Sequence, residues 1–508
     1  GFVNGYYESI GSYNVDALVG FKKNRHLLQL SGGRYFFDGW SPSSFDRDME
    51  WNPKEQYFGG LNYVYRTKND WFHKVKGNYF QDRILNRYDP AGSIPTAFDD
   101  WYSTQRIDGN YTIMGNINEN LSFNSVNSYN HYNRIKNRYQ KDLTTLESTL
   151  IADTQSEDNQ DTTQANQWMT RTYVSLDNPA KRISVQAGID INIENGKGGR
   201  FQDEDGSSAL IADLAGFVSA KIQINEKLSL QPALRYAYNT QFEVLPTPSL
   251  QFKYGINDKL TFRFNYGMGF RAPSLKELYL IFNDANHNIF GNQDLIPEQS
   301  QNLSSSLSFD ANKKLHKYQL NTKLFYNYKY NAIALTPDDN NVFQYVNIAK
   351  FTTMGAQVDG KYSCKNFTAN VGLSYTGLSN NSFTNQADEK AFFYYPQIQS
   401  NFSYFFRKAN LSLSLYNKWN GRRKDFRLVG LENTPEQVII DAYDIMDFTV
   451  QKGFWENRIR INAGVKNLLN ASNINGTTST GAHSGGDQGT QIAAGRTYFV
   501  GLKIGSKQ

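Results

Sequence analysis

The residue types that could carry out chemistry are few and scattered along this chain. Its histidines form no grouping with serine or carboxylate residues that is typical of a catalytic triad or a zinc site; they are His26, His73, His131, His287, His316 and His483. The single cysteine, Cys364, excludes an internal disulfide and a cysteine-based metal cluster. Because nothing pairs a nucleophile with a base, we predict that the chain is not an enzyme.

The segment 268–300 is the best candidate for a functional loop. Gly267 and Gly269 thin the end of a predicted strand, and Pro273 removes a ladder donor and ends it. Ser274 can then cap a short helix over Leu275–Phe282, with Glu277 at the capping-box position. Arg271 lies at the end of the predicted strand, where the loop begins. It could bind a ligand, but pairing with carboxylates of the wall or with a plug in the lumen is the more ordinary role for such an arginine.

A glycine-rich stretch, Gly476–Gly489, does not form a phosphate-binding loop. It lacks both the Lys-Ser/Thr ending and the following helix that such a loop requires. We predict that it is an external loop.

The elements that position these residues are strands, because the dominant sequence period is two. In 259–267, the side chains of Leu260, Phe262, Phe264 and Tyr266 share one face, while Arg263 and Asn265 lie on the other. The same alternation recurs through most of the chain, and little remains to build a second packing layer. We therefore expect the apolar face to meet lipid and the polar face to line a lumen, with closure satisfying every backbone group.

Composition supports a membrane barrel. Aromatic residues make up 15% of the 508 residues, yet the mean hydropathy is −0.61. No run of 18 apolar residues exists that would predict a membrane-spanning helix. The net charge of +5 is small for this length and argues against a nucleic-acid binder.

Short and long connections alternate along the chain. Ten short polar turns alternate with eleven longer segments, which predicts 22 antiparallel strands with both termini on the short-turn side. Short periplasmic turns and long extracellular loops are typical of bacterial outer-membrane barrels. The long loops are expected at 38–54, 82–102, 132–166, 194–209, 268–299, 329–341, 378–391, 421–440 and 468–494, with two shorter ones near Ser9–Ser12 and Gln241–Glu243. The predicted fold is an all-β, membrane-spanning barrel of 22 strands, the size of a plugged transporter.

The sequence also resembles the TonB-dependent outer-membrane receptors. GFRAPSLKELY (Gly269–Tyr279) and GNQDLIPEQS (Gly291–Ser300) are similar to the family's FRAP and NPxL-x-PE-x-S signature. VKNLLNASN (Val465–Asn473) resembles the family's stretch before the last external loop, and AGRTYFVGLKI (Ala494–Ile504) resembles its closing strand. Residues 38–92 are closest to the branch of cobalamin, siderophore and haem receptors. The motif residues are Phe270, Arg271, Ala272, Pro273, Asn292, Asp294, Leu295, Pro297 and Glu298.

The chain departs from the family pattern in two places. Gln293 stands where the signature has its proline. The family's N-terminal plug domain, with the TonB-contacting segment before it, is expected to be absent from this chain, so that residues 1–508 are barrel only. In a receptor that has a plug, the polar positions of the lumen would contact it. They are Arg263, Asn265, Asn321, Lys323, Arg458 and Arg460.

The resemblance adds two further site candidates. Haem receptors of the family carry a histidine between the two motif halves, where this chain has Asn286-His287-Asn288 near Asp284, and imidazole is a common axial ligand of haem iron. The ordinary alternative is a loop histidine bonded to its neighbours. The family's cobalamin branch binds calcium through acidic loop residues, and calcium prefers six to eight oxygen ligands. The matching acids here are sparse, so a solvated loop is the favoured interpretation; they are Asp46, Asp48, Asp82, Asp89, Asp99 and Asp100.

The resemblance implies a receptor in the Gram-negative outer membrane that imports a large, scarce nutrient such as a ferric siderophore, haem or cobalamin. Its implied partners are outer-membrane lipid, a plug in the lumen, the TonB complex and a surface lipoprotein or other assembly partner. The alternative is a plugless barrel that serves as a structural subunit or passive pore. The residues encoded upstream of Gly1 would distinguish the two interpretations.

Overall fold

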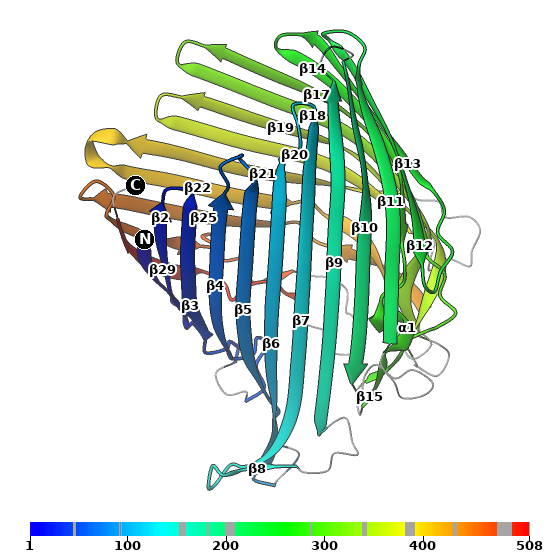
Figure 1. Cartoon of the computed structure of the whole chain (residues 1–508). Helices are drawn as coiled ribbons and strands as arrows, with labels where there is room; N and C mark the ends of the chain where they lie inside the picture. The colour runs from blue at the N-terminus through cyan, green and yellow to red at the C-terminus, as the bar shows by residue number, and fades with distance from the viewer. Residues whose placement is uncertain are drawn as a thin grey trace.

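The computed structural model describes residues 1–506, except 44–46, 91, 93, 152–158, 179, 181, 199–208, 285–286, 338–342, 381–391, 430–433 and 475–489. The described chain forms one closed antiparallel barrel (Figure 1). Its 22 strands are β1 (Phe2–Glu8), β2 (Ser12–Lys23), β3 (His26–Phe37), β4 (Lys54–Arg66), β5 (Phe72–Arg87), β6 (Thr96–Asn116), β7 (Leu121–Asp142), β9 (Gln160–Asn178), β10 (Ile183–Gly198), β11 (Ala209–Gln223), β12 (Leu228–Asn239), β13 (Thr247–Asn257), β14 (Leu260–Arg271), β17 (Glu298–Lys313), β18 (His316–Pro337), β19 (Phe343–Cys364), β20 (Phe367–Asn380), β21 (Phe393–Phe406), β22 (Leu411–Asn420), β25 (Tyr443–Phe454), β26 (Ile459–Lys466) and β29 (Thr497–Gly505).

Smaller elements occupy the connections. They are β8 (Ser148–Leu150), α1 (Leu275–Tyr279), β15 (Ile281–Asp284), β16 (His287–Phe290), the 3-10 turn η1 (Arg407–Ala409), β23 (Arg423–Val429), β24 (Thr434–Ile440), β27 (Asn473–Ile474) and β28 (Thr490–Gln491). The glycine-rich stretch Gly476–Gly489 lies outside the described residues. No helix in the described ranges is long and apolar enough to span a membrane.

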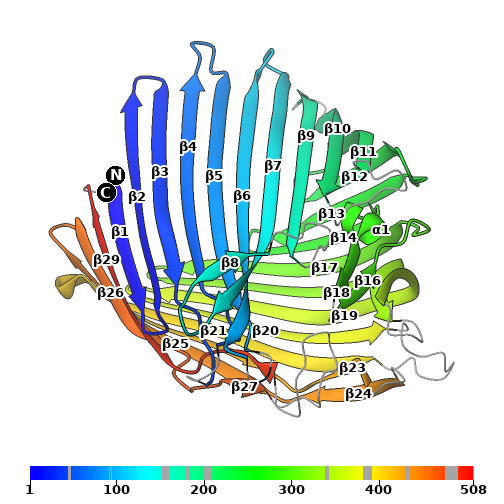
Figure 2. The ribbon, with the colours of Figure 1, turned by 90° about the horizontal axis from the view of Figure 1, so that it is seen from below.

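The barrel closes where the two ends of the chain meet. Each of the seven residues of β1 pairs with a residue of β29, from Phe2 opposite Gly505 to Glu8 opposite Phe499. Both termini lie at the end of the barrel that carries the short turns, as predicted (Figures 1 and 2).

The two faces of the wall follow the predicted alternation. Phe262 and Tyr266 lie opposite Leu307 and Leu303, whose side chains are 40% and 41% exposed on the outer surface. On the inner face, the Arg263 guanidinium donates to Ser308 Oγ at 3.3 Å. The predicted register is therefore confirmed in this part of the wall.

Asparagine side chains close several of the short turns. Asn118, Asn225 and Asn257 each accept the backbone N–H groups of the residues two and three positions later, at 2.9 to 3.0 Å. In other turns Asn24 and Asn410 adopt positive φ angles of 52° and 46°, which asparagine tolerates better than most residues. Local side-chain chemistry thus fixes the strand register at this end of the barrel.

The extracellular ends of several strands extend further than the sequence predicts. The expected loops 82–102 and 132–166 are wrong in their bounds, since β5 ends at Arg87, β6 begins at Thr96, β7 ends at Asp142 and β9 begins at Gln160. These extensions mix charged and amide residues with aromatic ones such as Phe98 and Trp101, so they lack the regular alternation of the wall. The backbone ladder therefore continues where the sequence alternation has stopped.

Candidate functional site

The segment after β14 forms a compact block at the extracellular end of the barrel. Pro273 is one of its fully buried side chains. Ser274 caps α1 by accepting from the Glu277 N–H, and the Glu277 carboxylate accepts from the Ser274 N–H at 2.7 Å. The capping box is confirmed, but the helix ends at Tyr279 rather than Phe282. The chain turns extended there because the next residues pair as β15 and β16.

Arg271 joins the strand, the helix and the returning strand. Its Nε donates to Glu298 at 2.6 Å, and its two terminal nitrogens donate to Glu277 at 2.8 and 3.1 Å. Glu298 also accepts from Lys329 at 3.2 Å and from the backbone N–H of Ile333 at 2.8 Å. We call Arg271, Glu277, Glu298 and Lys329 the charge network. It shows that Arg271 pairs with carboxylates of the wall and the helix, as the ordinary interpretation predicts.

The electrostatics of the helix follow from these contacts. Burial by itself raises the pKa of the Glu277 carboxyl, but hydrogen bonds from Arg271 and from Ser274 outweigh it. The pKa of Glu277 therefore lies below its ordinary value. The carboxylate stays charged, which also suits the N-terminal turn of a helix.

Apolar packing and amide groups hold the rest of the block. Leu275, Leu278 and Leu295 pack with the alanine and isoleucine side chains that begin β11, and Leu295 is 2% exposed. Asn292 donates from its backbone N–H to the Glu277 carbonyl and from its side chain to the Tyr345 carbonyl, both at 2.9 Å. The second half of the motif thus fastens the loop to β19.

The remaining motif residues have structural surroundings as well. The Asp294 N–H donates to the Asn292 side chain at 2.9 Å, while Ala272 and Pro297 are half-buried. Phe270 lies opposite Gln299 near the end of β14. No ligand group is needed to explain the contacts of these residues.

The histidine candidate lies in the same block. His287 begins β16, and its backbone is paired with Asp284 at the end of β15. Asn286 lies outside the described residues, and the side chains of Asp284 and His287 do so too. The geometry brings His287 and Asp284 together in one hairpin, but it does not test their role in binding.

The acidic loop candidates form ion pairs. The Asp99 carboxylate forms an ion pair with Arg47 at 2.6 Å. The Asp100 side chain is 0% exposed. Its carboxylate accepts hydrogen bonds from two nitrogens of Arg138 at 2.7 and 2.9 Å and forms an ion pair with Lys136 at 3.3 Å. Its third partner is the Tyr88 hydroxyl, which donates at 3.1 Å. Burial and the neighbouring charge of Asp100 raise the pKa of Tyr88.

These contacts already use most of the carboxylate oxygens that a bound cation would need. Asp89 accepts the backbone N–H groups of Arg47 and Asp48 at 3.0 and 3.1 Å. Asp82 lies in the strand ladder of β5, and Asp46 is outside the described residues. No grouping of three or more potential metal ligands occurs in the part of the chain that the structure describes. The sequence did not reveal the Asp100 ion cluster, because Arg138 and Asp100 are brought together only by the register of β6 and β7.

A polar cavity of about 420 Å³ lies between α1 and the inner wall. Its lining combines charged, amide and aromatic side chains that face Leu275 of the helix; they are Arg106, Asp108, Asn130, Tyr132, Gln167 and Glu194. Further along β7 toward the mouth, the Arg134 guanidinium lies 4.6 Å from the centre of the Tyr102 ring. This region offers hydrogen-bond donors, acceptors and aromatic rings to a ligand in the lumen.

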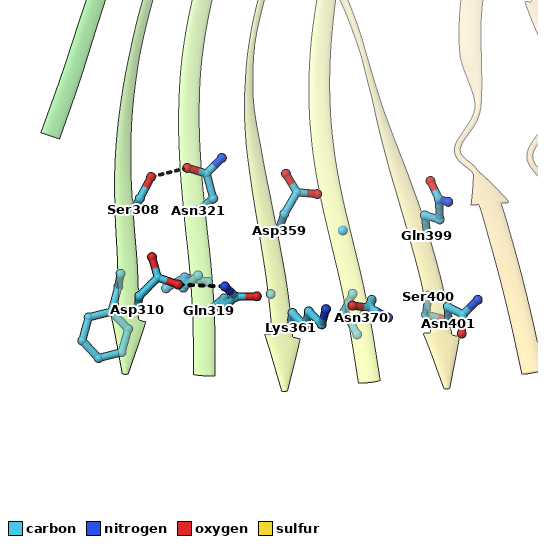
Figure 3. A pocket seen from close by; sticks show the side chains of 15 residues that line it. Ser308, Asp310, Gln319, Asn321, Asp359, Lys361, Asn370, Gln399, Ser400 and Asn401 are labelled. Carbon is cyan, nitrogen blue, oxygen red and sulfur yellow. Dashed lines mark hydrogen bonds between the residues drawn. The ribbon is translucent and has the colours of Figure 1, made fainter. Parts of the chain in front are cut away.

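A second lumen surface lies near the short-turn end. A trough of about 530 Å³ runs over β17 to β21, and Figure 3 shows its polar side chains in rows across neighbouring strands. Ser308 donates to Asn321 at 2.8 Å, and Gln319 donates to Asp310 at 2.9 Å. Of the expected lumen positions, Asn321 lies in this trough, whereas Arg458 lies in the β25–β26 turn before β26 begins at Ile459.

Comparison with known proteins gives one family and one fold. Residues 4–468 match the family model described as TonB dependent receptor-like, beta-barrel. No curated protein sequence matches the chain.

The solved structures similar to this chain include a siderophore receptor, PirA, from Acinetobacter baumannii, with 14% identity and a TM-score of 0.77 over 99% of this chain and 80% of that one. The ferric enterobactin receptor PfeA of Pseudomonas aeruginosa, as a mutant with bound enterobactin, has 14% identity and a TM-score of 0.76 over the same shares. The FrpB iron transporter of Neisseria meningitidis has 12% identity and a TM-score of 0.74, again over 99% and 80%.

Proposed function

Since the chain belongs to the TonB-dependent receptor-like β-barrel family of Gram-negative outer membranes, we propose that it imports a ferric siderophore through its lumen. Family members have a plug domain and interact with TonB. The similar structures named above are described as siderophore receptors and an iron transporter. Ligand capture takes place at the extracellular mouth, and energy comes from TonB acting on the plug.

The observation that carries this proposal is the mixed donor and aromatic lining of the inner wall beside α1. Arg106, Asn130 and Gln167 can donate to the oxygen atoms that surround iron in a chelate. Arg134 and Tyr102 form a stacked pair on which a flat ligand group can lie. The charge network ties α1 to β14, β17 and β18, so it fixes the helix that borders the cavity without binding the ligand itself.

The lumen trough over β17 to β21 is the proposed contact surface of the plug. Its amide, hydroxyl and carboxylate groups can exchange hydrogen bonds between a plug and water, so polar contacts there can form and break. This makes the trough suited to a domain that must move during transport.

The test is binding and uptake by the full-length protein. A panel of ferric siderophores, haem and cobalamin is titrated against purified receptor, and uptake of labelled iron chelate is measured with and without a functional TonB complex. Arg134→Gln should weaken chelate binding about tenfold, the order expected for one charged hydrogen bond. Arg25→Gln in the exposed β2–β3 turn, at the other end of the barrel, is the matched control and should leave the affinity unchanged.

Uptake that persists without TonB, or binding of haem or cobalamin alone, would contradict the proposal. Haem binding that is lost in His287→Ala would identify the hairpin histidine as an iron ligand instead. In that case binding should weaken as pH falls through the histidine pKa, near 6.5 when unperturbed, because protonated imidazole cannot coordinate iron.

A further inference from the structure

Three adjacent turns at the periplasmic end of the barrel carry an unbalanced positive charge. They are the β17–β18, β19–β20 and β21–β22 turns, seen as neighbouring hairpin ends in Figure 1. Their basic side chains are all exposed; they are Lys313, Lys314, Lys365, Arg407 and Lys408. No aspartate or glutamate lies within residues 313–316, 364–367 or 406–411. We call these five residues the basic rim.

Other turns at the same end differ in charge: the β2–β3 turn is also basic, with Lys22, Lys23 and Arg25, whereas several others are balanced or acidic. The β6–β7 turn carries Glu119 without a basic residue. The β11–β12 turn pairs Glu226 with Lys227, and the β13–β14 turn pairs Asp258 with Lys259. An unbalanced positive charge is therefore not a property of every short turn, and the basic rim is the place where three neighbouring turns share it.

Two of the three turns of the basic rim, β19–β20 and β21–β22, are joined by hydrogen bonds. Arg407 Nε donates to the Asn366 side chain at 2.6 Å, and the Phe405 N–H donates to the Asn366 carbonyl at 2.9 Å. In the described part of the chain, none of the four lysines of the rim forms an ion pair with a carboxylate. Their positive charges are thus available to a partner outside the barrel.

An aromatic surface lies directly beside the basic rim on the outer wall. Tyr318, Tyr404 and Phe406 are 42%, 42% and 41% exposed. The rings of Tyr318 and Tyr362 are 5.1 Å apart, and the Tyr362 hydroxyl lies 2.8 Å from His316 Nδ1. Aromatic rings of this kind mark the boundary between hydrocarbon and headgroups.

We propose that the basic rim binds the headgroups of anionic phospholipids in the periplasmic leaflet. The aromatic surface places the acyl chains beside the wall, and the basic side chains then lie at the level of the phosphates. Lysine and arginine stems can cover the apolar edge while their charges reach the headgroup. Clusters of four to eight basic residues next to a membrane-spanning segment typically bind anionic lipid. The proposal does not depend on which nutrient the receptor imports.

The experiment uses Cys364, the single cysteine, which lies on β19 next to Lys365. The full-length receptor is labelled there with a fluorophore and reconstituted in vesicles of phosphatidylcholine and phosphatidylglycerol, with bromine quenchers on one lipid or the other. A second protein, Ile224→Cys with Cys364→Ser, places the label at a balanced turn.

We expect quenching at Cys364 to be several-fold stronger with brominated phosphatidylglycerol than with brominated phosphatidylcholine at equal mole fraction. The excess should fall at high salt and disappear in Lys313→Gln/Lys314→Gln/Lys365→Gln, since each surface charge changes the affinity for anionic lipid about fivefold. Lys227→Gln/Lys259→Gln should leave the excess at Cys364 unchanged.

Equal quenching by the two lipids at Cys364 would overturn the proposal. So would an excess that survives the triple substitution, or one of the same size when the label is carried at position 224. Because all the substituted lysines are exposed, the variants should still fold, which electrophoresis with and without heating can check.

Discussion

Neutralising Glu298 should loosen the α1 block without unfolding the barrel. The Glu298 side chain is 6% exposed and accepts from Arg271, Lys329 and the Ile333 N–H. Glu298→Gln keeps the shape and one acceptor but removes the charge that two cations share. A charged hydrogen bond contributes about 1.5–3 kcal/mol. Arg271 is 44% exposed and keeps Glu277, so solvent screening places the loss at about 2 kcal/mol.

A loss of about 2 kcal/mol raises the open population of the block roughly 30-fold. Hydrogen exchange reports it at the N–H groups of Leu278 and Asn292, which donate to the Ser274 and Glu277 carbonyls. Asp441→Asn is the control, because the pair of Asp441 with Arg422 is 49% and 67% exposed and should contribute less than about 1 kcal/mol to its surroundings. Exchange at Leu278 that rises less than about threefold in Glu298→Gln would refute the reasoning.

Three further predictions concern other parts of the molecule. Phe262→Arg places a charge on the lipid face and should cost about 2–4 kcal/mol of barrel stability near the midplane, measured by equilibrium folding into vesicles, whereas Arg263→Ala on the lumen face should not. Asp100→Ala leaves Arg138 and Lys136 without their buried partner and should destabilise the β6–β7 extension by about 3–5 kcal/mol, which faster proteolysis of that hairpin would reveal. Because the pKa of Glu277 is lowered in the folded protein, its contribution to the stability of the α1 block is complete above the unfolded carboxyl pKa of about 4.3. That contribution is lost as pH falls through the lower folded pKa. Hydrogen-exchange protection of α1 that stays unchanged from neutral pH to below the folded pKa would contradict this prediction.

The wall of the barrel was accessible to prediction because its signal is local and repeated. Leu260, Phe262 and their neighbours alternate with polar residues, and asparagine-containing turns separate one strand from the next. Strand number and the position of the termini follow from counting these units. The strand ends at Arg87 and Asp142 did not follow, because above the lipid both faces meet water and the period-two pattern no longer has a physical cause.

The site was only partly predictable for a different reason. The capping box of Ser274 and Glu277 is a contact between residues three apart, so sequence alone identifies it. The partners of Arg271 at Glu298 and of Asp100 at Arg138 are 27 and 38 residues away and depend on strand register. An arginine or aspartate near a strand end therefore looks equally suited to a ligand until its partner on the neighbouring strand is known.

The seam between β1 and β29 has a consequence for how the barrel forms. These strands come from opposite ends of the chain, so this contact spans the largest sequence separation in the molecule and has the highest entropic cost of loop closure. It also comprises seven residue pairs, from Phe2 opposite Gly505 to Glu8 opposite Phe499, whereas the register of β18 and β19 extends from His316 opposite Cys364 to Pro337 opposite Phe343. Until it forms, both edges carry unpaired amides that hydrocarbon cannot solvate. An assembling chain therefore has to keep these edges in water, or pair them with another protein's strand, until the last residues of β29 have arrived.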